Sequence, residues 1–233
     1  MKPITRKVSW GLVLAVSAIV PLAAWQKWIP IANEDAWAFT TGAICVFFCV
    51  EESVWNFPIG IANNVVFFKI FYDGKLYANM GLQVVYVLLG LQGWYQWLYS
   101  GENKSRLTVT RTPPKTAVLL AALSIPATYG MRRLLLWQDG NSQFLDALTT
   151  VLSLVAQFLM NGKRLENWCV WLVADFIYIF IFFQQELYLS AALYILFVIM
   201  CVVGLNEWTV AMRSASLPKA AVPVASTAES EAA

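Results

Sequence analysis

Residues 187–208 read LYLSAALYILFVIMCVVGLNEW, and residues 76–97, which lie 111 positions earlier, read LYANMGLQVVYVLLGLQGWYQW. The two segments belong to a longer match that runs without a gap between residues 35–97 and 146–208. Twelve of these 63 aligned positions are identical, whereas a composition this apolar would give about five by chance. The chain therefore contains a duplicated unit, and duplicated apolar units are typical of membrane carriers.

The composition indicates an integral membrane protein. Apolar residues make up 59% of the chain and charged residues 13%, against roughly 25% charged in an average soluble domain. The net charge of +2 is too small to indicate a nucleic-acid partner. The chain has no histidine, which excludes His-ligated haem, His-based zinc sites and His-dependent catalytic triads. We therefore expect no metal and no cofactor, and we interpret the four cysteines as small apolar residues in lipid or packed interfaces.

A hydrocarbon core about 30 Å thick requires about 20 apolar residues per helix, and this length sets the expected fold. Eight segments qualify, at residues 8–25, 36–50, 54–72, 78–98, 114–136, 146–161, 167–185 and 187–208. We predict an all-α integral membrane protein with eight transmembrane helices in a one-three-one-three order. Its parts are an additional N-terminal helix in 1–30, a three-helix repeat in 35–98, a loop and linker helix in 99–140, a second three-helix repeat in 146–209 and a disordered tail in 214–233.

The helix count also predicts how the two repeats are oriented. Three helices plus one linker make an even number of crossings, so both repeats enter the membrane in the same direction and are parallel. With eight crossings both termini lie on one side, and eleven of the sixteen Lys and Arg residues fall on that side. The other five are Lys27, Lys69, Lys75, Arg132 and Arg133. The positive-inside rule therefore places both termini in the cytoplasm.

Polar residues within the apolar segments mark candidate functional positions, because a polar group in hydrocarbon is costly unless it meets a partner or water. In the seventh segment Trp168, Trp171, Asp175 and Tyr178 are spaced three, four and three apart, which places them on one helical face. Asp175 is the only acidic residue deep within any segment, and its counterpart 111 positions earlier is Asn64.

A second stripe of polar, aromatic and small residues runs along the fourth segment, from Gln83 and Tyr86 to Gly93 and Trp97. The eighth segment carries its copy, in which Tyr194 is the counterpart of Gln83. We predict that these stripes meet near the midplane between the repeats and bind substrate. The candidate substrate-binding residues are Asn64, Gln83, Tyr86, Trp168, Trp171, Asp175, Tyr178 and Tyr194.

Two structural interpretations compete with substrate binding at these and neighbouring positions. Trp and Tyr near helix ends often form interfacial belts, which is an equal alternative for Trp94, Trp97 and Trp208. Asparagine and glutamine often hold helices together, and this is an equal alternative to substrate contact for Asn56, Asn63 and Asn167.

The chemistry of the candidate site favours a particular ligand. Stacked Trp and Tyr faces attract flat rings and cations, and a carboxylate with no Lys or Arg partner in the spans suits a positively charged ligand. Amide side chains suit a ligand amide. An enzyme is disfavoured, because the spans contain no paired acids and no serine nucleophile with a base. We therefore expect a carrier of a flat, cationic, amide-bearing molecule with sugar hydroxyls.

Several motifs resemble those of the PnuC family of bacterial nicotinamide riboside transporters. They are residues 93–97 (GWYQW), residues 166–171 (ENWCVW) followed by Asp175, residues 76–77 (LY) and residues 204–208 (GLNEW). The resemblance covers residues 35–210. It implies a three-one-three helix plan similar to that of SWEET sugar transporters, a homotrimer in the bacterial inner membrane, and import of nicotinamide riboside by facilitated diffusion. The first helix is an addition to that plan.

Two alternatives stay open on the sequence alone. One is a related three-one-three carrier for another vitamin or for a sugar. The other concerns coupling, because Asp175 could carry a proton instead of facing a cationic ligand. Within the main hypothesis, we expect alternating access by rocking of one three-helix unit against the other around the midplane site.

Overall fold

The computed structural model describes residues 11, 19, 22–23, 25–27, 33–73, 77–136, 143–186 and 188–216. Within these residues the chain forms seven α-helices, one short 3-10 helix and no β-strand, apart from a single isolated bridge between Thr110 and Arg164. The α-helices are α2 (Asn33–Val50), α3 (Asn56–Asp73), α4 (Tyr77–Tyr99), α5 (Pro114–Leu135), α6 (Gln143–Asn161), α7 (Asn167–Gln184) and α8 (Tyr188–Ser216).

These helices lie close to the ranges expected from the sequence. The largest difference is at the end of α8, which continues to Ser216, so that the first three residues of the expected tail are helical. The rest of the tail, and nearly all of the expected first helix at 8–25, fall outside the described residues. An additional helix before these seven, and the plan of eight transmembrane helices, therefore stay predictions.

Three of the described helices are long and apolar enough to cross a membrane by their own composition, over Phe144–Asn161, Asn167–Gln184 and Ser190–Ala215. All three belong to the second copy of the duplication. The described helices of the first copy are not among them, and polar side chains interrupt two of them, with Asn63 and Asn64 in α3 and Gln83 in α4. All three of these amides line a cavity between the copies, so they are not exposed to lipid.

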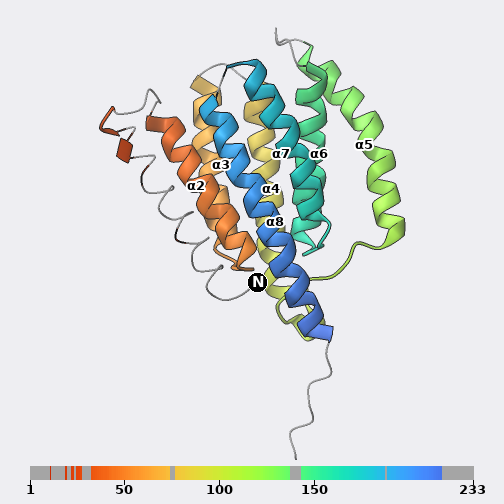
Figure 1. The fold of residues 1–233 in the computed structure, drawn as a ribbon. Helices are drawn as coiled ribbons and strands as arrows, with labels where there is room; N and C mark the ends of the chain where they lie inside the picture. Colours follow the sequence, from red (N-terminus) through yellow and green to blue (C-terminus); the bar gives the residue numbers. More distant parts are fainter. Residues whose placement is uncertain are drawn as a thin grey trace, which may run out of the picture.

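The helices alternate in direction along the chain (Figure 1), so that α2 and α6, α3 and α7, and α4 and α8 run the same way. Within each copy, neighbouring helices pack on one another. Between the copies, α2 contacts α8 and α4 contacts α6. These two contacts exchange when the copies are exchanged. The linker α5 packs on α6 at the outer edge of the bundle.

Individual side chains repeat this reciprocal arrangement. Trp97 donates its indole N–H to the carbonyl of Met160 at 3.1 Å, and Trp208 donates to the carbonyl of Cys49, also at 3.1 Å. Each tryptophan is the other's counterpart, and so are the two acceptors. The indole rings also meet, with centroids 5.9 Å apart, and both are buried. The interfacial-belt interpretation of Trp97 and Trp208 is therefore wrong, because both rings seal the contact between the copies.

The turns that follow α2 and α6 are duplicates as well. Each backbone hydrogen bond of residues 51–57 recurs 111 positions later, and Glu52 and Lys163 both adopt a left-handed conformation, with φ of 52° and 47°. Lys163 Nζ lies 2.8 Å from Glu52 Oε2 and 4.5 Å from the centroid of the Trp97 ring. Glu52 and Lys163 are counterparts, so their ion pair joins the two copies at the pseudo-twofold axis that relates one copy to the other.

Two retained glycines allow this packing. A Cβ atom added to Gly204 would lie 2.5 Å from Trp168 Cζ2, and one added to Gly93 would lie 2.5 Å from Phe57 Cε1. Phe57 and Trp168 are counterparts, and each ring also packs edge-on against the tryptophan of its own copy. The glycines therefore keep α4 close to α3 and α8 close to α7.

The connection between α4 and α5 crosses the same end of the bundle. Thr110 and Leu165 lie side by side, with Leu165 N–H donating to the Thr110 carbonyl at 2.9 Å. Thr112 donates its backbone N–H and its hydroxyl to the Glu166 carboxylate at 2.7 and 2.6 Å. Burial alone would raise the pKa of Glu166, but these hydrogen bonds and the charge of Arg111 lower the pKa below its usual value. The residues before α5 are therefore hydrogen-bonded to the residues before α7.

Candidate functional site

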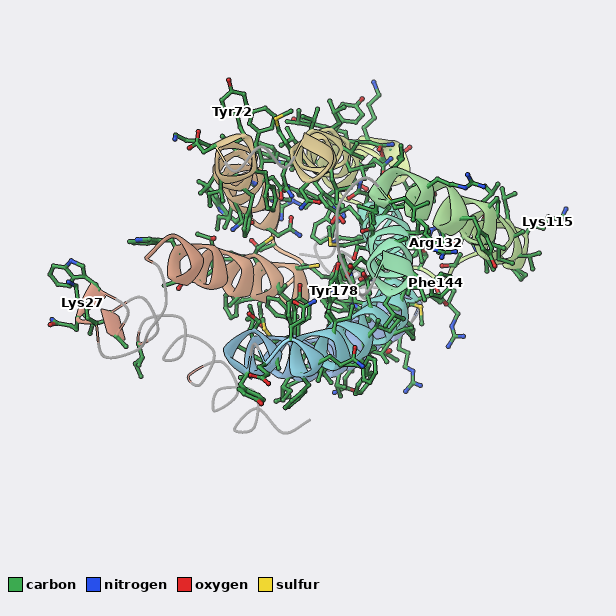
Figure 2. The ribbon with its side chains drawn as sticks, turned by 90° about the horizontal axis from the view of Figure 1, so that it is seen from above. Lys27, Tyr72, Lys115, Arg132, Phe144 and Tyr178 are labelled. Atoms are coloured by element: carbon green, nitrogen blue, oxygen red, sulfur yellow. The ribbon has the colours of Figure 1, made fainter. Side chains whose placement is uncertain are left out.

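A cavity of about 480 Å³ lies between the two copies, in the size range of small-molecule sites. Its walls come from α2, α3, α4, α6, α7 and α8. All eight residues predicted from the sequence line it: Asn64, Gln83, Tyr86, Trp168, Trp171, Asp175, Tyr178 and Tyr194. Seen along the bundle, Tyr178 lies in the middle of the helices, whereas Tyr72 and Lys115 point outward (Figure 2). The role of the eight residues in binding substrate stays a prediction.

One end of the cavity is filled by the tryptophan cluster, which we define as Trp97, Trp168 and Trp208. The three indoles are at most 2% exposed. The residues whose carbonyls accept from Trp208 and Trp97, Cys49 and Met160, are themselves lining residues of the cavity. The cavity therefore ends directly on the reciprocal contact between the copies.

The walls supplied by the two copies differ although their backbones correspond. Where the first copy places the small or apolar residues Gly42, Val46 and Gly60, the second places Ser153, Gln157 and Trp171. Asn64 is likewise replaced by Asp175, and Gln83 by Tyr194. At these positions the second copy carries the larger, aromatic or charged side chains, while the first copy contributes the amides Asn63, Asn64 and Gln83 to the wall.

Asp175 lies in α7 and is 3% exposed. Its Oδ2 accepts a hydrogen bond from Cys201 Sγ at 3.5 Å, and none of the described Lys or Arg residues forms an ion pair with it. A thiol is a weak donor, so the carboxylate is poorly compensated by the protein itself. A cationic ligand in the cavity would supply the missing charge.

Aromatic side chains surround this carboxylate. Tyr178 and Tyr194 pack with ring centroids 4.7 Å apart, and Tyr194 also meets Phe197 at 5.4 Å. Trp171, which is partly buried, lines the same cavity one turn before Asp175. Such a wall binds flat rings by stacking and favours positive charge over its faces.

Helix α6 also contributes to the site, although none of the residues predicted from the sequence lies on it. Ser153 and Gln157 line the cavity, and with Thr149 and Asn161 they form a polar stripe at a spacing of four. That spacing is a signal on its own, since it places four polar groups on one face of an apolar helix. Comparison of the copies hides the signal, because the counterparts of Ser153 and Gln157 are Gly42 and Val46. Three of the four cysteines, Cys45, Cys49 and Cys201, also line the cavity.

The structure distinguishes helix packing from cavity lining for the asparagines Asn56, Asn63 and Asn167. Asn63 lines the cavity and donates to the Thr41 hydroxyl of α2 at 2.5 Å. Asn56 and Asn167 lie outside the lining residues, fully buried at the starts of α3 and α7, and Asn167 Nδ2 donates to the Arg164 carbonyl at 2.6 Å. The structural interpretation therefore fits Asn167, while Asn63 serves both helix packing and the cavity.

A bundle of apolar helices around a central cavity with one buried carboxylate defines a multi-pass membrane protein of the transporter class. Comparison with known proteins identifies the family within this class. The family model described as nicotinamide mononucleotide transporter matches residues 34–210. The chain therefore belongs to that family of transporters.

Individual relatives and a solved structure agree with this assignment. The chain is 28% identical over 193 residues to the nicotinamide riboside transporter PnuC of Escherichia coli, covering 72% of this chain and 81% of that protein. It is 24% identical over 185 residues to the riboflavin/roseoflavin transporter RibM of Streptomyces davaonensis, covering 76% and 84%. The crystal structure of the vitamin B3 transporter PnuC superposes with a TM-score of 0.70 at 22% identity, covering 89% of this chain and 92% of that chain, and so has the same fold.

Proposed function

We propose that this protein imports nicotinamide riboside. Relatives that the chain resembles over most of its length carry that name. The observation that carries the proposal is the buried carboxylate of Asp175, which has no cationic partner among the described residues and lies among packed aromatic side chains. A pyridinium ring with a carboxamide and a ribose supplies a flat cation, an amide and hydroxyls, which are the groups that the lining residues can pair.

The arrangement in the membrane is part of the same proposal. The protein lies in the bacterial inner membrane, with both termini in the cytoplasm. Eight transmembrane helices run in a one-three-one-three order, and α5 joins the two parallel three-helix repeats. The common direction of α2 and α6 supports parallel repeats. The excess of Lys and Arg at the end of the bundle that holds the tryptophan cluster supports a cytoplasmic location of that end and of both termini. The sequence resemblance adds a homotrimer to the proposal.

Transport follows by facilitated diffusion with alternating access. The reciprocal bonds of Trp97 and Trp208 and the Glu52–Lys163 pair join the two copies at the proposed cytoplasmic end. Rocking of one copy against the other would separate these contacts and open the cavity toward the cytoplasm, while the opposite ends approach. A gradient of protons or sodium ions is not required by this scheme, and liposome uptake without any gradient is its direct test.

Nicotinamide riboside is expected to bind at least about 100-fold more tightly than nicotinamide mononucleotide, because the phosphate must lose its water without gaining a cation. No described Lys or Arg lines the cavity, and the Asp175 carboxylate would repel the added charge. Isothermal titration of the detergent-purified protein measures both dissociation constants. Equal affinity for the two ligands would overturn this account of the site.

The same titration separates the proposal from its rival, a carrier of riboflavin or another neutral vitamin. The relationship to a riboflavin/roseoflavin transporter makes this rival concrete. Riboflavin offers a flat ring without a positive charge, so it gains stacking but leaves Asp175 uncompensated. Binding of riboflavin with no detectable binding of nicotinamide riboside would replace the proposed substrate and leave the fold and the cavity unchanged.

Lys163→Glu is expected to lower the melting temperature, because it places two carboxylates together at the contact between the copies, beside the tryptophan cluster. Adding Glu52→Lys should restore the melting temperature, since it re-forms the ion pair with the two charges exchanged between structural counterparts. The expected coupling free energy is roughly 1 to 3 kcal/mol. Thermal unfolding of both single variants and the double variant measures it.

The matched control is the exposed Lys69–Asp73 pair of α3, with 2.7 Å between Lys69 Nζ and Asp73 Oδ2. Lys69→Glu should change the melting temperature very little, because exposed ion pairs contribute about 0 to 1 kcal/mol. If the double variant at positions 52 and 163 melted no higher than the single variants, the reciprocal geometry would not extend to this pair.

A further inference from the structure

Gln157 is a cavity residue whose amide is oriented by a chain of hydrogen bonds. It lies on α6, one turn before the helix ends at Asn161, and it lines the cavity. Asn161 Nδ2 donates to the backbone carbonyl of Leu89 on α4 at 2.7 Å, and Gln157 Nε2 donates to Asn161 Oδ1 at 3.0 Å. The Gln157 side chain is therefore connected to the backbone of the opposite copy.

The backbone carbonyl of Leu89 fixes the direction of both hydrogen bonds in this series. A backbone carbonyl only accepts hydrogen bonds, so Asn161 must turn its NH₂ group toward Leu89 and its oxygen toward Gln157. Gln157 must in turn give its NH₂ group to Asn161. This leaves Gln157 Oε1, to which the structure gives no protein partner among the described residues, as an acceptor at the cavity wall.

The surroundings keep the chain in place. Asn161 is 1% exposed, so its amide has no water with which to exchange partners. Gly93 of α4 makes room for it, because a Cβ atom there would overlap Asn161 Oδ1. The counterparts of Gln157 and Asn161 in the first copy are Val46 and Val50. The first copy therefore has no counterpart of this oriented acceptor.

Its height in the bundle relates it to the rest of the site. Helices α6 and α7 are antiparallel neighbours joined by a short turn, so Gln157, four residues before the end of α6, is level with Trp171, four residues after the start of α7. Asp175 lies one turn further from that turn. A ring stacked against Trp171 can thus reach Gln157 with one substituent and direct its charged nitrogen toward Asp175.

We propose that Gln157 is a specificity-determining residue that reads the carboxamide of the ligand, with Oε1 accepting an amide N–H and with Asn161 acting as its positioning residue. This inference rests on the proposed function and names the group that selects the amide. A ribose hydroxyl can donate or accept and would not be distinguished by a fixed acceptor, whereas an amide NH₂ group can only donate. An analogue with a carboxylate, or with a methyl ketone, in place of the carboxamide has no donor for Gln157.

The test compares ligands that differ only at this group. Nicotinamide riboside and 3-acetylpyridine riboside, in which a methyl group replaces the amide nitrogen, are titrated into the wild-type protein, Gln157→Met and Asn161→Val. In the wild type the ketone is expected to bind about 10- to 100-fold more weakly, because it leaves a buried acceptor unpaired. In Gln157→Met the two ligands should bind with nearly equal affinity, since neither meets an acceptor.

Asn161→Val tests the positioning role while Gln157 is kept. Without Asn161 the Gln157 amide is free to rotate and offer its NH₂ group, so nicotinic acid riboside should gain at least about tenfold relative to nicotinamide riboside. A residue with only a structural role would lower both affinities together and leave this ratio unchanged. Gln184→Met, at the exposed end of α7, is the control for loss of a glutamine outside the cavity and should leave both ratios as in the wild type.

The outcomes separate this inference from the function on which it rests. If the wild type binds nicotinamide riboside but does not distinguish it from the ketone, the inference is wrong and the proposed function stands. The inference is equally wrong if Gln157→Met discriminates between the two ligands as the wild type does. If the wild type binds none of the ribosides, the proposed function is wrong and the inference is overturned with it. The comparison of ligands in the wild type needs no variant to fold.

Discussion

Asp175→Asn is expected to weaken the binding of nicotinamide riboside by about 30- to 150-fold, which corresponds to roughly 2 to 3 kcal/mol. The substitution keeps the size of the side chain and removes its charge. Asp175 is 3% exposed, and among the described residues only the Cys201 thiol donates a hydrogen bond to it. A pyridinium would therefore meet a carboxylate that neither water nor the described Lys and Arg residues compensate. Isothermal titration in detergent measures the change.

The reason for the loss can be checked in the same samples. Removal of a poorly compensated buried charge should leave the melting temperature of the ligand-free protein unchanged or raise it, so weaker binding cannot be ascribed to misfolding. Asp146→Asn on α6 makes the same chemical change at a residue that does not line the cavity, and it should bind like the wild type. Full affinity in Asp175→Asn would show that the carboxylate does not face the ligand cation.

Trp208→Ala is expected to cost about 3 to 5 kcal/mol of stability and to lower the melting temperature by roughly 10 °C. Trp208 is completely buried, packs against Trp97 and Trp168 and donates to the Cys49 carbonyl of the other copy. Its removal opens a cavity at the place where the two copies meet. Thermal unfolding followed by light scattering or intrinsic fluorescence measures the effect.

Two further variants divide this effect into its parts. Trp208→Phe keeps an aromatic ring and loses the hydrogen bond to Cys49, so it should cost only about 1 to 2 kcal/mol. Trp55→Ala removes a tryptophan that is 62% exposed in the turn before α3 and should have little effect. If Trp55→Ala and Trp208→Ala destabilised the protein equally, the central role of the tryptophan cluster would be refuted.

Most residues of the candidate site are predictable because their signal is local. A polar residue in an apolar helix must face the interior, and spacings of three and four place Trp168, Trp171, Asp175 and Tyr178 on one face without any knowledge of neighbouring helices. The same reasoning applied to α6 identifies Ser153 and Gln157, which line the cavity. Matching of the two copies does not reveal them, because their own counterparts are Gly42 and Val46.

Other features cannot be decided from one sequence. A tryptophan near the end of a helix is equally favourable in an interfacial belt and in a packed core, so nothing local distinguishes exposed Trp55 from buried Trp208. Likewise, the spacing of 111 residues relates Glu52 to Lys163 but does not say that they touch. Only the meeting of the two copies brings Lys163 Nζ to 2.8 Å from Glu52 Oε2.

The sequence by itself therefore determined the seven described helices, the duplication and the cavity-lining faces of α3, α4, α7 and α8. These features depend on hydrogen bonds and periodicities within about 20 consecutive residues. The tertiary structure decided which faces meet, that Trp97 and Trp208 join the copies, and that Gln157 is oriented through Asn161 by the carbonyl of Leu89. These contacts link residues far apart in the chain, and their direction depends on the distance and orientation of groups that only the packed bundle brings together.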